Sequence, residues 1–310
     1  MRKSTTSKHR SPAPISKDFG VSFSVKACRA YNIDPDKVLK WLLDKGWRRF
    51  RLMSYWDEHE KSPGEVDLTQ LDKHIRVIKN YGGEVTLCIG ARQPRWPESH
   101  WPDWAWELPP DVRNSRLSKY IKTVMNRYKN EATIVSWQLE NEALNRGFGE
   151  RGNFDRKRLR SEMKLVKSID PTRPVIMTTS NTWGVPLRRP RANLYGYTYY
   201  TVQMTDKGYK STKLPKHWYK LRSIMIRMLT GRKSFIHELQ AEPWGNKPVQ
   251  NMTFSEQSES MDPERLKHNI ELAKSTGLYP IDLWGAEWWY WRATAHNDPS
   301  IYTAVESSVR

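Results

Sequence analysis

The feature that most constrains the fold is a regular alternation of short β-rich runs and amphipathic helical segments from Asp18 onward. Within each helical segment the apolar residues recur at three- and four-residue steps, as one buried helix face requires. Strands that alternate with helices form parallel sheets, because each crossover helix returns the chain to the same edge of the sheet. The predicted strands are residues 19–25, 48–55, 84–89, 134–139, 175–179, 194–200, 234–238 and 281–284.

Eight such strands in a chain of 310 residues predict a single (β/α)₈ TIM barrel, an α/β fold that needs about 250 residues. The helix stripe formed by Trp218, Leu221, Met225 and Met228 is expected to pack on the barrel like the others. The crossover of residues 182–193 is short and holds two prolines, so the fifth helix is expected to be degenerate. The short chain after the eighth strand predicts that the last helix is degenerate as well.

The N-terminal segment and the two cysteines allow further predictions. Residues 1–17 hold five cations and no acid, which predicts a basic disordered tail before a barrel domain of residues 18–310. This tail lacks the apolar centre of a secretory signal, although a chain whose export signal had been removed would look the same. No apolar run is long enough to span a membrane, so a soluble monomer in the cytoplasm is favoured. Cys28 and Cys88 are expected to be buried free thiols.

The formal net charge of +18 raises the question of an acidic partner. No zinc finger, RNA-recognition motif or basic zipper is present, so specific binding of nucleic acid is not expected. A weak attraction to acidic polymers is the remaining expectation for the charge. The sequence also lacks His-x-x-x-His, paired-cysteine and Walker-type motifs, so we predict no metal and no cofactor.

Acidic residues stand at the C-terminal ends of two predicted barrel strands, where barrel enzymes place their chemistry. The fourth strand ends in Gln138-Leu139-Glu140-Asn141-Glu142, and the seventh ends in His237-Glu238. Alternation along a regular strand puts Gln138, Glu140 and Glu142 on one face, and turns His237 away from Glu238. Because the two strand ends face each other across the barrel mouth, Glu142 and Glu238 could flank one bond. Glycoside hydrolysis needs such a pair, about 5–5.5 Å apart for retention and about 6.5–9.5 Å apart for inversion.

Other residues near these strand ends have alternative interpretations. Glu140 could bind substrate or pair with Arg51 or Arg49, and Glu242 could bind a sugar hydroxyl from its loop. Binding or structural roles are favoured over catalysis for both of these acids and for Glu287. Two long loops hold tryptophans, which are hard to explain as core and favour a ligand-facing role for some of them. These tryptophans are Trp96, Trp101, Trp104, Trp106 and Trp244.

The region from about Asp18 to Trp291 resembles clan A of the retaining glycoside hydrolases, the cellulase-like barrels with their two catalytic acids on strands four and seven. The Asn141-Glu142 ending and the segment His237-Glu238-Leu239-Gln240 carry this resemblance, together with Arg51-Leu52, Gly196–Tyr200 and Trp284–Trp288. The subfamily stays open, because the amino-acid sequence of strand seven differs from that of the commonest cellulases.

The resemblance implies a role for each matching residue. It implies Glu142 as acid/base, Asn141 as a ligand of the sugar 2-hydroxyl, Glu238 as nucleophile, Arg51 beside the nucleophile, Tyr200 as its hydroxyl partner with Tyr199 as the register alternative, and Trp284, or secondly Trp288, as the floor of the sugar subsite.

The resemblance therefore implies a retaining, metal-independent O-glycosyl hydrolase that cleaves β-linked oligo- or polysaccharides by double displacement through a covalent glycosyl-enzyme. A catalytically silent sugar-binding barrel is the alternative, and ion pairs that tie up the two glutamates would favour it. A third hypothesis is a basic protein that binds an acidic polymer, which salt-sensitive binding without turnover would favour. The sugar, the linkage and exo or endo action are left open.

Overall fold

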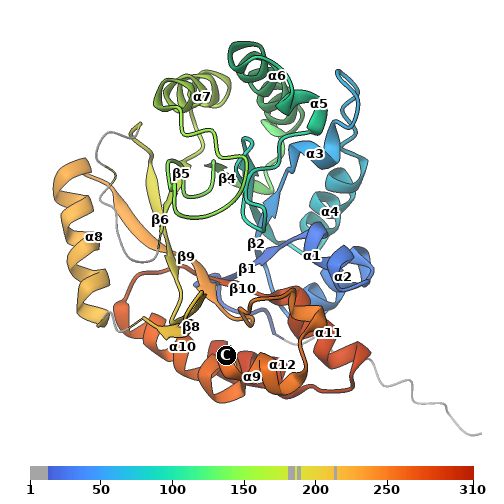
Figure 1. The fold of residues 1–310 in the computed structure, drawn as a ribbon, viewed down its shortest axis with the longest axis vertical. Coiled ribbons are helices and arrows are strands. Elements are labelled where there is room, and N and C mark those ends of the chain that lie inside the picture. The colour runs from blue at the N-terminus through green and yellow to red at the C-terminus, as the bar shows by residue number, and fades with distance from the viewer. Residues whose placement is uncertain (1–12, 181–185, 187–189, 213–214) are drawn as a thin grey trace, which may run out of the picture.

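The structure is a computed structural model, and it describes residues 13–180, 186, 190–212 and 215–310. Eight parallel strands close into a barrel inside a ring of helices, which confirms the predicted TIM barrel (Figure 1). Each predicted strand agrees with an observed one to within two residues at either end. In order around the barrel the strands are β1 Phe19–Phe23, β2 Arg49–Met53, β3 Glu84–Ile89, β4 Ile134–Leu139, β5 Val175–Thr179, β6 Leu194–Tyr199, β9 Lys233–Gln240 and β10 Ile281–Trp284.

Two of the helices begin at an aspartate that caps their first turn. Asp34 and Asp262 each accept a hydrogen bond from a backbone amide of the first turn, at 2.8 and 2.7 Å, and a proline follows each of them. The helices are α1 Val25–Ala30, α2 Pro35–Asp44, α3 Trp56–His59, α4 Thr69–Asn80, α5 Asp103–Trp106, α6 Pro110–Tyr128, α7 Arg156–Ile169, α8 Lys216–Thr230, the 3₁₀ helix η1 Val249–Asn251, α9 Phe254–Ser260, α10 Pro263–Thr276, α11 Ala286–Ala295 and α12 Ser300–Val309.

Three connections differ from a regular barrel. The described residues between β5 and β6 contain no helix, and most of that crossover lies outside the described residues. An antiparallel hairpin of β7 (Val202–Thr205) and β8 (Gly208–Ser211), absent from the sequence prediction, follows β6. The prediction of a degenerate last helix is wrong, because both α11 and α12 follow β10 and pack beside α2 and α10.

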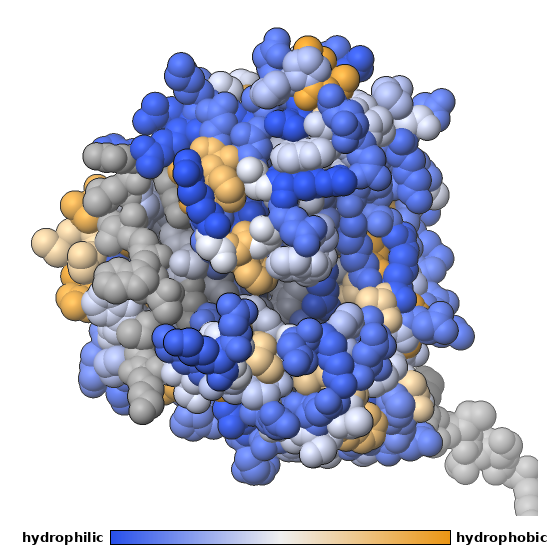
Figure 2. Space-filling view, viewed as in Figure 1, coloured by the Kyte–Doolittle hydropathy of each residue, from blue (hydrophilic) through white to orange (hydrophobic). Residues whose placement is uncertain are grey.

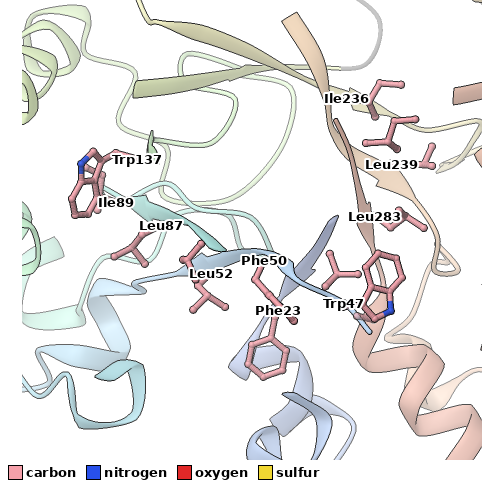
Figure 3. Close-up of a cluster of buried hydrophobic side chains, with 14 of the residues drawn as sticks. Phe23, Trp47, Phe50, Leu52, Leu87, Ile89, Trp137, Ile236, Leu239 and Leu283 are labelled. Atoms are coloured by element: carbon pink, nitrogen blue, oxygen red, sulfur yellow. The ribbon is translucent and has the colours of Figure 1, made fainter. Parts of the chain in front are cut away.

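The apolar core lies between the strands and the helices, and the barrel interior is polar. Phe50, Leu52, Leu87, Leu283 and their neighbours form this core, and Figure 3 shows their side chains pointing outward from the strands. The alternate residues point inward and are polar, because successive side chains of a strand face opposite ways. This inner set includes Arg49, Arg51, Thr86, Ser136, Gln138, Thr178 and Asp282, all buried or nearly so.

Helix α8 packs on the barrel through a different face from the predicted one. Leu221, Met225 and Met228 are exposed, and the buried residues of the helix are Tyr219, Arg222 and Ile226. The spacing rule found an apolar stripe correctly but assigned it to the wrong side, since the inner side of this helix includes an arginine.

The N-terminal segment is only partly described. Residues 1–12 of the predicted tail lie outside the described residues. Ile15 is buried, and its amide donates to the Gly46 carbonyl at 2.9 Å. The packed part of the chain therefore begins before the predicted boundary at Asp18. Within the described ranges, no helix has both the length and the apolar character needed to cross a membrane.

Because the core lies between the strands and the helices while one face of α8 is exposed, two leucine-to-alanine substitutions should change the free energy of unfolding by different amounts. Leu283→Ala should lower the free energy of unfolding by about 3 kcal/mol, because it leaves a cavity between strand and helices. Leu221→Ala should change it by less than about 0.5 kcal/mol, because that side chain is already exposed. Urea unfolding followed by circular dichroism measures both, and equal losses would contradict this placement of the core.

Candidate active site

Arg51 on β2 is the centre of the polar network at the barrel mouth. Its guanidinium is fully buried and donates to Gln138 Oε1 at 2.7 Å, to Asn141 Oδ1 at 3.0 Å and to Glu238 Oε2 at 2.8 Å. It also donates to the His237 carbonyl at 3.1 Å. One cation therefore joins the ends of β4 and β9, the two strands that the sequence analysis paired across the mouth.

The end of β4 departs from a regular strand. Glu140 and Glu142 have φ values of +54° and +42°, so the alternation of side chains stops after Leu139. The prediction that Gln138, Glu140 and Glu142 share one face is therefore wrong. Gln138 and Asn141 both contact Arg51 instead, and the two left-handed residues direct the two glutamates to separate partners.

Glu140 is a structural acid in this arrangement. It accepts hydrogen bonds from the amides of Ala91 and Arg92 at 3.0 and 3.2 Å and forms an ion pair with Arg158 at 2.9 Å. Its predicted pairing with Arg51 or Arg49 is thus wrong. Gly90 makes the approach possible, because a Cβ at that residue would lie only 2.6 Å from Glu140 Oε1.

Glu142 is held by two side chains at the edge of the network. Its Oε1 accepts a hydrogen bond from the Thr198 hydroxyl at 2.8 Å, and its Oε2 accepts one from the Asn145 amide at 2.7 Å. Its backbone amide donates to Thr178 Oγ1 at 2.6 Å, and the Thr178 hydroxyl donates to Asn141 Oδ1 at 2.9 Å. These contacts attach Glu142 to β5 and β6, and within the part of the chain that the structure describes it forms no ion pair.

Glu238 follows an irregularity in β9. The register of β9 against β6 shifts by one residue between Ile236 and Glu238. His237 therefore does not point away from Glu238. It pairs with Asp282, the partner of Arg49, while Glu238 pairs with Arg51 one layer nearer the mouth. Arg49 and Arg51 lie two residues apart on β2 and so share the inner face, which places both side chains inside the barrel.

The charge on Glu238 is set by opposing effects. Burial raises the pKa of Glu238 above its usual value, Arg51 opposes that rise, and the nearby Glu142 adds to it. The Tyr200 hydroxyl donates to Glu238 Oε1 at 3.1 Å and favours the ionised form. The effect of burial on the pKa of Glu238 is larger than that of the arginine. The side chain of Glu238 is 12% exposed, so it still reaches the mouth.

Glu98 is a third carboxyl in the same network, and the sequence analysis missed it. Its Oε2 accepts a hydrogen bond from Asn141 Nδ2 at 2.9 Å and lies 4.0 Å from Arg92. Burial raises its pKa to about 8, and the charges of Glu238 and Glu142 contribute to that rise. A protonated carboxyl at neutral pH can both donate and accept a hydrogen bond. Only its position in a Pro-rich, charged loop after β3 could have marked Glu98 in the sequence.

Trp284 and Glu242 form a second cluster at the mouth. Glu242 Oε1 accepts a hydrogen bond from Trp284 Nε1 at 2.8 Å and pairs with Arg95 at 2.7 Å. The Arg95 guanidinium lies over the Trp284 ring, 5.0 Å from its centroid. Trp284 belongs to a small apolar cluster with Met53 and Cys88, and Tyr200, the partner of Glu238, packs against that cluster. Glu242 therefore positions Trp284 and Arg95 beside the nucleophile candidate.

Four aromatic residues, Trp96, Phe148, Tyr200 and Trp244, form what we call the aromatic rim. Trp96 meets Phe148 edge-on with centroids 5.7 Å apart, Phe148 meets Trp244 at 5.8 Å, and Trp244 meets Tyr200 at 5.4 Å. Each follows a different barrel strand, and Trp96 is 56% exposed. The aromatic rim thus extends from solvent to the hydroxyl that contacts Glu238, and Figure 2 shows that this view of the molecule is hollowed near its centre.

Several other candidates lie outside the site. Trp288, the second choice for a sugar floor, is fully buried and donates to Gln257 at 2.9 Å, so the structure contradicts that choice. Tyr199 packs on Tyr219 of α8, with ring centroids 4.2 Å apart, and faces away from Glu238. Glu287 is buried and accepts a hydrogen bond from the Ser24 amide.

The other tryptophans of the loop after β3 are structural. Trp101 and Trp104 pack on Trp56 with centroids 5.6 and 5.7 Å away, and the Arg113 guanidinium covers Trp106. Of the five loop tryptophans, Trp96 and Trp244 therefore remain as ligand-facing candidates. Among the described residues, no group of three or more His, Cys, Asp or Glu side chains has the arrangement of a metal site.

Comparison with known proteins places this site in a familiar fold. Residues 109–225 match the family model described as "Glycosyl hydrolases family 2, TIM barrel domain", which covers less than half of the chain. No curated protein is similar enough in sequence to count as a match. The resemblance to clan A glycoside hydrolases therefore rests on this partial match and on structure.

Three solved structures share the fold at low sequence identity. GH5_18 from Streptomyces cattleya, solved with GlcNAc, has a TM-score of 0.62 and 14% identity over 89% of this chain and 71% of that one. The exo-β-1,4-mannosidase Op5Man5 from Opitutaceae bacterium strain TAV5 has a TM-score of 0.61 and 14% identity, over 86% of this chain and 51% of that one.

An endo-β-1,4-xylanase of family 10 from Gloeophyllum trabeum has a TM-score of 0.57 and 14% identity, over 86% of this chain and 82% of that one. These similarities confirm the resemblance to clan A glycoside hydrolases at the level of the fold. At such identities they assign no activity and no residue role to this chain.

The raised pKa of Glu98 predicts a pH dependence of folding stability. The pKa is about 8 in the folded chain against 4.5 for an ordinary glutamate, so between these values the folded state binds more protons than the unfolded state. The stability of the wild type should therefore fall, relative to Glu98→Gln, as the pH rises from about 5 to about 8. Urea unfolding at a series of pH values measures this difference.

The exposed Glu107 of the same loop supplies the control. Glu107→Gln removes an exposed carboxyl of the same loop and should follow the wild type across the whole pH range. A wild type that ran parallel to Glu98→Gln from pH 5 to 8 would show that Glu98 ionises normally.

Proposed function

We propose that the protein is a retaining glycoside hydrolase that cleaves a β-linked oligo- or polysaccharide, with Glu238 as nucleophile and Glu142 as acid/base. The observation that carries this proposal is the Arg51 network. In it, Asn141 at the end of β4 and Glu238 of β9 both accept hydrogen bonds from one guanidinium. Tyr200 contacts the other oxygen of Glu238. Ion pairs on both glutamates would favour a silent sugar-binding barrel, but among the described residues only Glu238 of the two forms one, and its side chain is still 12% exposed.

The contacts of the two glutamates support different catalytic roles for them. Glu238 is bound by a cation and a hydroxyl, which favour the carboxylate that attacks the anomeric carbon. Glu142 accepts hydrogen bonds from Thr198 and Asn145 rather than from a cation, and in this proposal it carries the proton that the leaving oxygen requires. Attack neutralises Glu238, and the loss of that charge lets Glu142 release its proton and then activate water.

The surrounding residues fit a sugar-binding site. In this proposal Trp284 and the aromatic rim cover the apolar faces of sugar rings, while Asn141 and Glu98 together receive a hydroxyl of the sugar at the cleavage point. Because Asn141 Oδ1 is already held by Arg51, its Nδ2 is the group that points to Glu98 and to substrate. The rim's length favours several sugar subsites rather than one.

Removing each glutamate should give a different chemical defect. With an aryl glycoside that carries a good leaving group, Glu142→Ala should still form the glycosyl-enzyme but should accumulate it, since no base activates water. Azide needs no base, so it should restore turnover and give the β-azide. Glu238→Ala lacks the nucleophile, so azide can react only from the opposite face and should give the α-azide. Each loss without azide should be on the order of 10³-fold or more.

A panel of aryl glycosides and polysaccharides identifies the substrate, and NMR of the azide products distinguishes the anomers. Glu107→Ala, a change of an exposed glutamate outside the site, should keep normal activity. The same anomer from both variants, or near-normal hydrolysis of a natural substrate by either one, would show that these roles are wrongly assigned.

A further inference from the structure

The outer face of α8 is apolar and exposed to solvent. Leu221, Ile224, Met225, Met228 and Leu229 all lie there, and Met228 is 80% and Ile224 55% exposed. The steps of three, four and seven residues from Leu221 place the first four in one stripe. Figure 2 shows apolar surface projecting at the left edge, where Figure 1 places α8. Isolated exposed apolar side chains are ordinary, but five on one short helix mark an interaction site.

This outer stripe is not needed to hold α8 on the barrel. The inner face of the helix does that: Tyr219 packs on Tyr199, and Ile226 is fully buried. The Arg222 guanidinium covers the Tyr197 ring and donates to the Thr179 hydroxyl at 2.8 Å. The outer side chains are therefore available to a partner without any change in the barrel.

Basic residues accompany the apolar stripe. Between Asp206 and Glu238 the chain holds nine lysines and arginines and no acid. On α8 itself Lys216, Lys220 and Arg227 are exposed, and their spacing of four and seven residues lines them along one side of the stripe. None of these three forms an ion pair with a described residue, and the exposed acids of helices α2 and α10, by contrast, pair with a lysine of their own helix. Their charge is therefore available to an anionic surface.

We propose that α8 is a peripheral membrane-binding helix for an anionic lipid surface. Its apolar stripe enters the boundary between headgroups and acyl chains, and the flanking lysines and arginine contact the lipid phosphates. A second copy of this chain is a poor partner for the same face, because two such helices would bring like charges together. A purely anionic polymer would leave the apolar side chains in water. The face lies on the outer ring of helices, so this binding is independent of the proposed catalytic site.

Sedimentation with lipid vesicles tests this proposal on the full chain. The vesicles are phosphatidylcholine alone, or phosphatidylcholine with about a third of phosphatidylserine. The wild type should bind the anionic vesicles at least about tenfold more tightly, with a loss of binding as salt is added. Ile224→Ser with Met228→Ser, and separately Lys220→Glu with Arg227→Glu, should each weaken binding by about tenfold or more.

The exposed residues of α6 provide matched controls. Val112→Ser removes an exposed apolar side chain, and Lys119→Glu with Lys122→Glu makes the same change of net charge as the α8 pair. Both should bind within about twofold of the wild type, and circular dichroism melts should show that every variant is folded. The proposal is wrong if the wild type ignores anionic vesicles, or if the α6 charge variant loses as much binding as the α8 one. It is equally wrong if Ile224→Ser with Met228→Ser binds normally, or if sedimentation equilibrium shows a dimer that this variant abolishes.

Discussion

A guanidinium buried inside a closed barrel must have all its charge compensated nearby, and Arg51 imposes this constraint on the whole mouth. Its three side-chain acceptors come from β4, from the turn after β4 and from β9. Asn141 in turn accepts a hydrogen bond from Thr178 and donates one to Glu98. The positions of the candidate acid, nucleophile and third carboxyl therefore all depend on one cation on β2.

The barrel mouth holds more carboxyl groups than the single positive charge of Arg51 can neutralise. Glu98, Glu142 and Glu238 interact electrostatically, and burial adds to the cost of ionising Glu98 and Glu238. The site resolves this by pairing Glu238 with Arg51 and by keeping Glu98 protonated near neutral pH. With Glu98 protonated, the charge of Arg51 is left to Glu238, which is the ionised carboxylate that the proposed nucleophile requires.

The sequence predicted the barrel because strand and helix periodicity is local, and each strand was located to within two residues. The resemblance to clan A glycoside hydrolases implied that Arg51 and Tyr200 lie beside Glu238, and the structure has both contacts. It could not show the left-handed turn at Glu140 and Glu142 or the register shift in β9, because these depend on tertiary contacts. The same holds for Glu98, whose loop has no periodic signal, and for α8, where two stripes compete and the inner one contains Arg222.

The most direct test of the account is covalent trapping of the nucleophile. Activated 2-deoxy-2-fluoro glycosides slow hydrolysis of a glycosyl-enzyme more than its formation when the leaving group is good, so the intermediate accumulates. Mass spectrometry of the digested protein should then locate the sugar on the peptide that contains Glu238, and Glu238→Gln should remain unlabelled. A label on Glu142 or Glu98, or rapid turnover to the inverted product with no label, would contradict the assignment of Glu238 as nucleophile.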